Sequence, residues 1–363
     1  MKKKNLGPAG IDQKLVGVFL LLAVGVLFFV SMTGILAEVG PYWLRCIIAE
    51  FVTCAPILVY AVYYKKSVVM MLGLNPVKLR VVLLAILVEI CVTPACGLCN
   101  AITELFTPNV VDASLGASLD ETPYILMMVS MALIPALVEE LAFRGIIYSA
   151  FSRSGRKFAA VLFTALCFGL VHGNINQFAY AFLVGIVFAV VNEAAGSIFP
   201  SIAMHFFTNG ISITFMYYAR NLIAAETQYA NMLEQIGEEQ DGVTQILLNT
   251  DSISTITDAV YITSLVLVAG LAVGGAVLAF KLVRTIARIT GRTEHMEKIL
   301  PYFLAKRMRM PVYGVKPLER PSGDEEPDGT KTRIMNPVLA AGICVWVAFM
   351  VFYELLVHGV ISL

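Results

Sequence analysis

The chain has 363 residues, of which 58% are hydrophobic and 14% are charged, and its 26 basic and 26 acidic residues leave no net charge. A soluble domain carries about a quarter charged residues, so this composition excludes an ordinary soluble protein. The absence of net charge gives no indication of nucleic acid as a partner. The composition predicts a membrane protein.

Apolar segments of a length that crosses a bilayer recur along the whole chain. A membrane-spanning helix needs about 20 predominantly apolar residues. We predict eight to nine spans, which follow in chain order at 15–37, 43–64, 81–99, 124–151, 158–172, 177–192, 197–218, 259–280 and 336–358. The first apolar run is longer than the core of a signal peptide, so we expect a retained anchor. The predicted fold is an all-α, polytopic membrane helix bundle.

The basic residues predict which side of the membrane each connecting segment faces. With the N-terminus inside, the inner segments are 1–14, 65–80, 152–157, the turn near 193–196, and 281–334. They hold every Lys and Arg except Arg45 and Arg144, which lie in spans, and Arg220. Cytoplasmic segments carry this excess of positive charge. We therefore predict that the N-terminus is inside and the C-terminus outside.

The spans and connections divide the chain into four parts. Residues 1–119 form N-terminal membrane spans, and 120–220 form a core that holds most of the buried polar residues. Residues 221–258 form an outer polar loop with room for a short helix. Residues 259–363 hold the C-terminal spans, with a basic and linker-like cytoplasmic segment at 281–334.

Ionisable residues inside a membrane are costly and are therefore functional candidates. Within or beside the predicted spans they are Arg45, Glu50, Glu89, Glu139, Glu140, Arg144, His172, Glu193, His205, Glu354 and His358. Several of them gather between 124 and 218, and Asn209 joins them there. This cluster predicts an internal polar cavity.

The stretch "LVEELAFRG" places two carboxylates and a guanidinium in one span. Glu140 and Arg144 are separated by four residues with the acid first, which is the favourable order for a pair on one helix face. Glu139 lies about 100° around the helix from Glu140. We predict that Glu140 pairs with Arg144 and that Glu139 points elsewhere.

Two histidines and an asparagine lie at compatible depths on neighbouring spans. Measured along helices from the inner side, Glu139 and His172 both lie roughly 21–22 Å deep. Phe168 precedes His172 by four residues, so the two rings share a face. His205 and Asn209 are spaced in the same way on the seventh span. The side chains can meet at mid-membrane or slightly outside it.

This set of side chains supports two forms of peptide hydrolysis. In the first, a carboxylate and an imidazole activate water while a histidine and an amide stabilise the oxyanion. In the second, Glu139, His172 and His205 hold Zn²⁺ with one position left for water. The chain has no H-E-x-x-H motif. The residues alone leave both forms open.

Three short motifs resemble those of a known family. The motifs "EELAFR" (139–144), "FGLVH" (168–172) and "HFFTN" (205–209) resemble E-E-x-x-x-R, F-x-x-x-H and H-x-x-x-N of the CAAX protease and bacteriocin-processing family, also called the Abi family. The resemblance covers roughly 120–220. Each motif alone is weak, whereas three in this order and spacing are specific.

The resemblance implies an intramembrane endopeptidase that acts on a membrane-associated protein or peptide. It places water activation on Glu139 and His172 and oxyanion stabilisation on His205 and Asn209. Glu140, Arg144 and Phe168 become supporting residues. The resemblance also favours a metal-free mechanism without a cofactor. We expect the lipid bilayer and the substrate as partners, no nucleic acid, and a bacterial plasma membrane as the location.

Two other functions remain open from the sequence. Glu50, Glu89, Glu139 and His172 can line a proton or ion path in a transporter, although the chain shows no inverted repeat. Alternatively, the protein is a non-catalytic scaffold or immunity protein that binds a partner through the same cavity. The complete motifs favour the enzyme, because a relative without catalytic activity need not retain all four polar residues.

Overall fold

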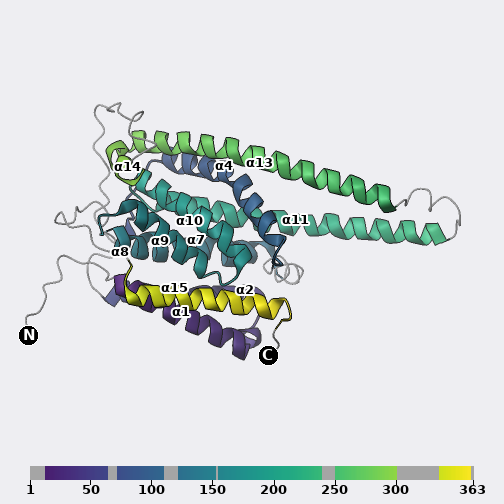
Figure 1. Cartoon of the computed structure of the whole chain (residues 1–363), viewed down its shortest axis with the longest axis horizontal. Coiled ribbons are helices and arrows are strands. Elements are labelled where there is room, and N and C mark those ends of the chain that lie inside the picture. Colours follow the sequence, from purple (N-terminus) through teal and green to yellow (C-terminus); the bar gives the residue numbers. More distant parts are fainter. Residues whose placement is uncertain are drawn as a thin grey trace, which may run out of the picture.

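The computed structural model describes residues 13–63, 72–109, 122–152, 154–238, 250–300 and 335–360. Every regular element in these ranges is a helix, and the helices form one bundle from which two of them project (Figure 1). The predicted all-α class is therefore confirmed.

The helices follow the predicted spans closely. In chain order they are α1 (Gln13–Thr33), η1 (Ile35–Glu38), α2 (Tyr42–Tyr63), α4 (Leu79–Glu104), α6 (Tyr124–Met127), η2 (Met128–Leu133), α7 (Ile134–Glu139), η3 (Glu140–Ile147), α8 (Tyr148–Ser152), α9 (Lys157–Leu170), α10 (Ile175–Ala195), α11 (Phe199–Glu238), α13 (Thr250–Ile289), α14 (Thr293–Ile299) and α15 (Pro337–Val357). The segments α6 to α8 follow one another without a break and form a single span.

Six of the helical segments in the described ranges are long and apolar enough to cross a membrane. They are Tyr42–Val59, Leu79–Glu104, Tyr124–Ser152, Ile175–Ala195, Ile262–Ile289 and Pro337–Val357. Leu15–Val30 and Lys157–Leu170 are shorter apolar helices. The chain is a multi-pass membrane protein, and its total of eight to nine spans stays a prediction.

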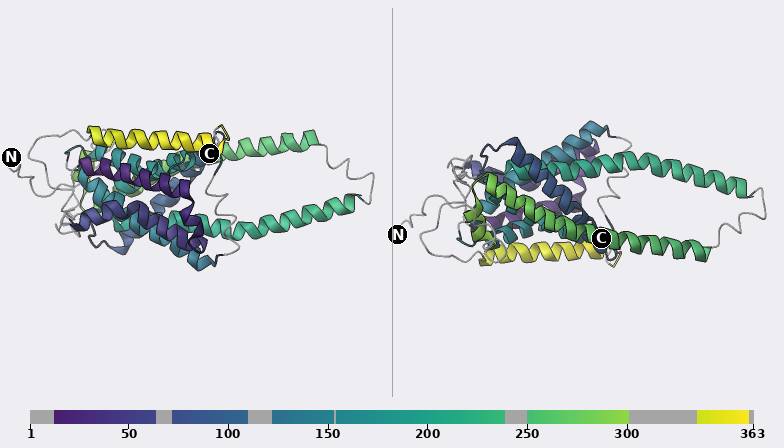
Figure 2. Two further views of the ribbon diagram at one scale, coloured as in Figure 1. Left: turned by 90° about the horizontal axis from the view of Figure 1, so that it is seen from below. Right: turned by 90° about the horizontal axis from the view of Figure 1, so that it is seen from above.

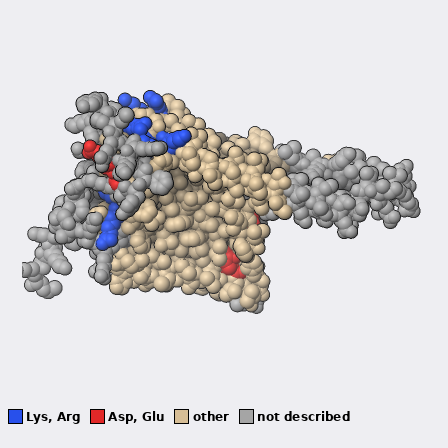
Figure 3. Space-filling model, turned by 45° about the horizontal axis from the view of Figure 1, so that its top comes forward, with Lys and Arg blue, Asp and Glu red and all other residues tan. Residues whose placement is uncertain are grey.

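The outer surface of the bundle suits a lipid environment. Large apolar side chains remain exposed along α13, for example Leu267 at 63% and Val273 at 69%. On the face shown in Figure 3, the Lys and Arg side chains of the described residues gather at one end of the bundle. An apolar surface of this extent is stable when a membrane covers it.

The first and last helices pack side by side and in parallel (Figures 1 and 2). Gly17 meets the start of α15, where an added Cβ would lie 2.5 Å from the backbone nitrogen of Leu339. Farther along, Trp346 Nε1 donates to the carbonyl of Leu20 at 2.8 Å. Small residues allow membrane helices to approach this closely.

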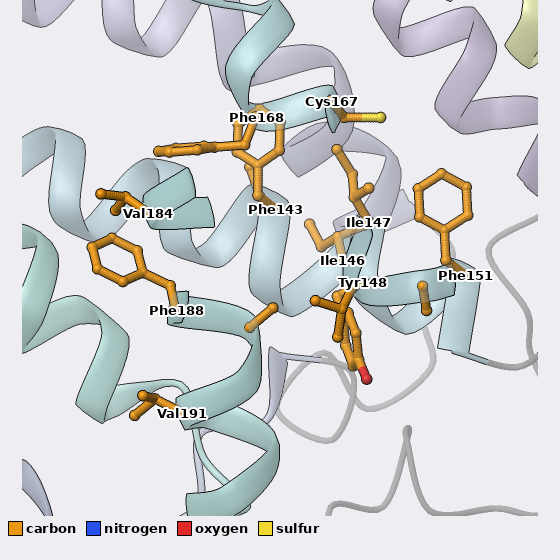
Figure 4. Close-up of a cluster of buried hydrophobic side chains, with 14 of the residues drawn as sticks. Phe143, Ile146, Ile147, Tyr148, Phe151, Cys167, Phe168, Val184, Phe188 and Val191 are labelled. Carbon is orange, nitrogen blue, oxygen red and sulfur yellow. The ribbon is translucent and has the colours of Figure 1, made fainter. Parts of the chain in front are cut away.

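The core lies where α9, α10 and the span of α6 to α8 meet. Phe143, Phe168 and Phe188 come from three different elements and point into a common apolar cluster (Figure 4). Gly185 on α10 lets that helix approach α9, because an added Cβ would lie 3.1 Å from Ala165. This packing fixes the spacing of the helices that carry the candidate site.

A buried polar network joins α14 and the turn before it to the end of α10. Arg292 Nε donates to the carbonyl of Glu193 at 2.6 Å, and Thr290 donates to the carbonyl of Ala194 at 2.6 Å. His295 also contacts the carboxylate of Glu193. These bonds satisfy carbonyls at the C-terminal end of α10.

The prediction of an outer polar loop at 221–258 is wrong where the structure describes this segment, at 221–238 and 250–258. Residues 221–238 continue α11, and residues 250–258 belong to α13. Both helices extend well beyond the rest of the bundle (Figures 1 and 2). The physical reason is intrinsic propensity, because "LIAAETQYANMLEQ" is rich in the strong helix formers Ala, Glu, Gln, Leu and Met. Polarity alone did not indicate a loop.

Candidate active site

The span that carries both glutamates is not a regular α-helix. Two π-helical segments, η2 and η3, flank the short α7. Pro135 stands near the start of α7 and has no N–H to donate to the carbonyl of Met131, four residues earlier. Single π turns occur frequently at functional sites. The local winding therefore differs from the regular helix that the sequence pattern predicts.

Glu140 and Arg144 form the predicted pair. Arg144 Nη1 donates to Glu140 Oε1 at 2.7 Å, and both side chains are fully buried. A buried charge needs such a partner because the surrounding medium cannot solvate it. The prediction of this ion pair is confirmed.

Aromatic rings enclose the guanidinium of Arg144. Its Cζ lies 4.0 Å from the centre of the Phe168 ring and 5.1 Å from that of Phe188. A guanidinium over a ring face gains a cation–π interaction that strengthens when water is excluded. Phe168 therefore supports Arg144 as well as the histidine that follows it.

His205 connects the two glutamates. Its Nδ1 lies 3.2 Å from Glu140 Oε1, and its Nε2 lies 3.8 Å from Glu139 Oε2. The ring packs against Phe168 and Phe188, with centroids 5.8 and 5.6 Å away. His205, on α11, is thus held between carboxylates of a different span.

His172 is oriented by the turn that ends α9. Its Nδ1 donates to the carbonyl of Phe168 at 2.8 Å, and its ring meets the Phe168 ring edge-on at 5.1 Å. Gly173 adopts a φ of +76°, which favours glycine. Asn174 then caps α10 by accepting from the backbone of Gln177.

The hydrogen bond to Phe168 also determines which ring nitrogen of His172 is left to accept a hydrogen bond. A carbonyl oxygen only accepts, so Nδ1 carries the proton of this bond. In a neutral ring Nε2 is then left as the acceptor. His172 therefore offers a basic nitrogen away from its own helix.

Glu139 and His172 line the same cavity, whose volume is about 140 Å³. A water molecule occupies about 30 Å³ in the liquid, so the cavity has room for several. Its lining consists of Cys46, Ala49, Glu50, Thr53, Cys54, Glu139, Phe143, Val171 and His172. The first five lie on one face of α2. A carboxylate and an imidazole thus face one polar space within the bundle.

Asn209 lies on the same helix as His205 but outside that lining. Its Nδ2 donates to the carbonyl of Met131 at 3.1 Å. Pro135, four residues later, has no N–H to donate to this carbonyl. The adjacent Thr208 donates to Glu89 Oε1 at 2.6 Å. One N–H of the Asn209 amide is therefore engaged with the span that carries Glu139.

The sequence missed that α2 supplies more than half of the cavity lining. Glu50 stood out only as one of several charged residues in spans, and the residues do not reveal which helices are neighbours. In the structure, Glu50 lines the same cavity as Glu139. The face formed by Cys46, Glu50 and Cys54 was a detectable signal, because these residues are spaced at one helical turn.

The zinc alternative, with Glu139, His172 and His205 as ligands, stays a prediction. Within the described ranges, no group of three or more His, Cys, Asp or Glu side chains lies close enough together to hold a metal ion. His205 instead approaches the two glutamates, and His172 uses one nitrogen for its own helix.

Comparison with known proteins gives one finding. Residues 121–211 match the model of the family described as type II CAAX prenyl endopeptidase Rce1-like. The matched range holds all three motifs, and it confirms the family resemblance predicted from them. No curated protein and no solved structure matches the chain.

Proposed function

We propose, from the match of residues 121–211 to the Rce1-like type II CAAX prenyl endopeptidase family, that this chain is an intramembrane endopeptidase. Its substrate is a membrane-associated protein or peptide. The observation that carries the proposal is the shared cavity of Glu139 and His172, because a carboxylate and an imidazole together can activate water.

In the proposed reaction, Glu139 takes a proton from a water molecule in the cavity. Nε2 of His172 accepts the second hydrogen bond of that water and orients it. The resulting hydroxide attacks the carbonyl carbon of the scissile peptide bond. Holding the water and the scissile bond next to each other removes much of the entropic cost of this encounter.

His205 and Asn209 are proposed to stabilise the oxyanion. A proton on each ring nitrogen lets His205 donate to Glu140 through Nδ1 and to the oxyanion through Nε2. The Asn209 amide has two N–H donors, of which one is used by Met131. Arg144 keeps Glu140 charged and in place, so that His205 has a fixed partner.

The mutation of the catalytic base is the first test. We expect Glu139→Gln to lower kcat on a farnesylated Cys-Ala-Ala-Leu peptide in detergent micelles by about 10²–10⁴-fold, the range for loss of a general base. Cleavage is measured by mass spectrometry. Glu104→Gln is the matched control, because Glu104 ends α4 and accepts from Asn100 outside the cavity.

Full activity in Glu139→Gln would refute the assignment of the base. If the wild-type protein cleaves neither this peptide nor its unprenylated form, the result favours a non-catalytic scaffold. Proton flux into liposomes that depends on Glu139 would instead favour a transporter.

The metal-free mechanism has its own test. We expect cleavage to survive dialysis against a chelator, because the proposed steps use only Glu139, His172, His205 and Asn209. The rate before and after dialysis is compared, and zinc is then added back. A loss of activity that zinc restores would overturn this part of the proposal.

A further inference from the structure

The cavity contains a second carboxyl group that the proposed reaction does not use. Glu50 projects from α2 and lines the cavity opposite the span of Glu139. The carboxyl groups of Glu50 and Glu139 therefore face the same space. Cys54 also donates to Glu50 Oε1 across one helical turn, at 3.5 Å.

A hydrogen bond between two carboxyl groups requires a proton. Ionised carboxylates only accept, so a hydrogen bond between Glu50 and Glu139 forms when one of them carries a hydroxyl group. Both residues lie in membrane spans, where two adjacent negative charges would be poorly solvated. One proton held by the pair relieves this repulsion, as it does in other paired carboxyl groups.

We propose that Glu50 is a further catalytic residue, the general acid that protonates the leaving amine, with Glu139 as the base. The inference rests on the proposed peptidase function. It assigns different tasks to two carboxyl groups that line the same cavity.

The proton balance of this cycle closes without a further reactant. Glu139 takes one proton from water as the hydroxide adds to the carbonyl carbon. When the tetrahedral intermediate collapses, the carbon–nitrogen bond breaks, and the amine takes the proton of Glu50. The proton on Glu139 then passes across the cavity to Glu50, which restores the starting pair. The products are one carboxylic acid and one amine.

The other groups around Glu50 do not supply this proton as readily. Cys46 and Cys54 lie on its own helix, and a thiol is a weak donor. His172 faces the cavity, but the proton on its Nδ1 is engaged with Phe168. Within the cavity lining, Glu50 is thus the carboxyl group left to act as the acid.

The decisive experiment compares two leaving groups. The first probe is the farnesylated Cys-Ala-Ala-Leu peptide, and the second carries a p-nitrophenyl ester in place of the scissile amide. An amine leaves only after protonation, whereas p-nitrophenolate leaves without it. We expect Glu50→Gln to lower kcat about 100-fold or more on the amide, the scale of general acid catalysis. On the ester we expect the wild-type rate within a small factor.

Controls separate this role from a structural one. Glu139→Gln should slow both probes, because both need an activated water. Glu104→Gln should slow neither. Equal losses on both probes in Glu50→Gln would overturn the general acid, and so would full activity on the amide.

A second measurement does not depend on turnover. It therefore tests the shared proton even if the protein proves not to be a peptidase. Infrared spectra of the purified protein report the C=O stretch of protonated carboxyl groups. If Glu50 and Glu139 share a proton, Glu50→Gln and Glu139→Gln each shift or remove the same band. Changes in two unrelated bands, or a Glu50→Gln spectrum that keeps the band lost in Glu139→Gln, would overturn the shared proton.

Discussion

Arg144 shows how one residue makes a polar site tolerable inside an apolar bundle. Its guanidinium pairs with Glu140 at 2.7 Å and lies over the rings of Phe168 and Phe188. Glu140 in turn lies 3.2 Å from His205. Arg144 therefore acts on the candidate site through Glu140 and His205, and it is a positioning residue.

Replacing Arg144 tests this arrangement at the residue scale. Arg144→Met leaves Glu140 as a buried charge without its cation, which costs about 3–5 kcal/mol in the free energy of unfolding. Thermal unfolding in detergent measures the loss. Adding Glu140→Gln removes the uncompensated charge, so the double variant should regain most of the lost stability.

Activity should behave differently from stability in this pair of variants. The double variant still lacks the carboxylate that holds His205 Nδ1, so its kcat should stay low. Recovery of both stability and kcat would contradict a positioning role for Glu140.

At the scale of elements, α1 and α15 support the turn that carries His172. Phe349 and Trp346 of α15 pack against Gly173, where an added Cβ would lie 3.2 Å from the Phe349 ring. Glu354 accepts from the backbone nitrogen of Ile175 at 3.0 Å. The close contact of α1 with α15 therefore stabilises a helix that borders the site.

Two glycines on α1 provide a matched test of that contact. Gly17→Ala places a methyl group 2.6 Å from the carbonyl carbon of Val338, so the helices must separate. Overpacking of this kind costs about 1–3 kcal/mol. Gly25→Ala meets no atom within 4 Å and should not destabilise the protein. Thermal unfolding compares the two, and equal stability would contradict the tight contact.

At the scale of the whole molecule, the parallel packing of α1 and α15 constrains the topology. Gly17 lies beside Val338 near the start of both helices, and Phe28 lies 6.3 Å from Phe352 near their ends. Both helices thus cross the bundle in the same direction. This direction agrees with an odd number of crossings, as the nine predicted spans require.

Thiol labelling of intact cells tests the orientation. Ile35 and Val360 follow α1 and α15 and are 51% and 67% exposed, and Leu79, at the start of α4, is 70% exposed. In a variant without native cysteines, a membrane-impermeant reagent should label Ile35→Cys and Val360→Cys from outside. Leu79→Cys should react only after permeabilisation, because basic residues predict its side as cytoplasmic. The reverse pattern would contradict the N-in orientation.

Much of this protein was predictable because its signals are local. Apolar runs predict membrane helices, since each span satisfies its own backbone hydrogen bonds. The Glu140–Arg144 pair followed from a spacing of four residues, and the edge-on contact of Phe168 with His172 followed in the same way. These contacts lie within one turn of helix, and so the residues alone determined them.

The tertiary structure decided which spans meet and how the chain winds between them. Most spans are apolar around much of their surface, so periodicity does not indicate the neighbour of a given face. Only the packing places Glu50 of α2 against Glu139, and only the packing turns Asn209 toward the carbonyl above Pro135. Likewise, only the structure shows the π-helical segments η2 and η3. The sequence by itself determined the helices and the residue types of the site, whereas helix packing decided which of them share the cavity.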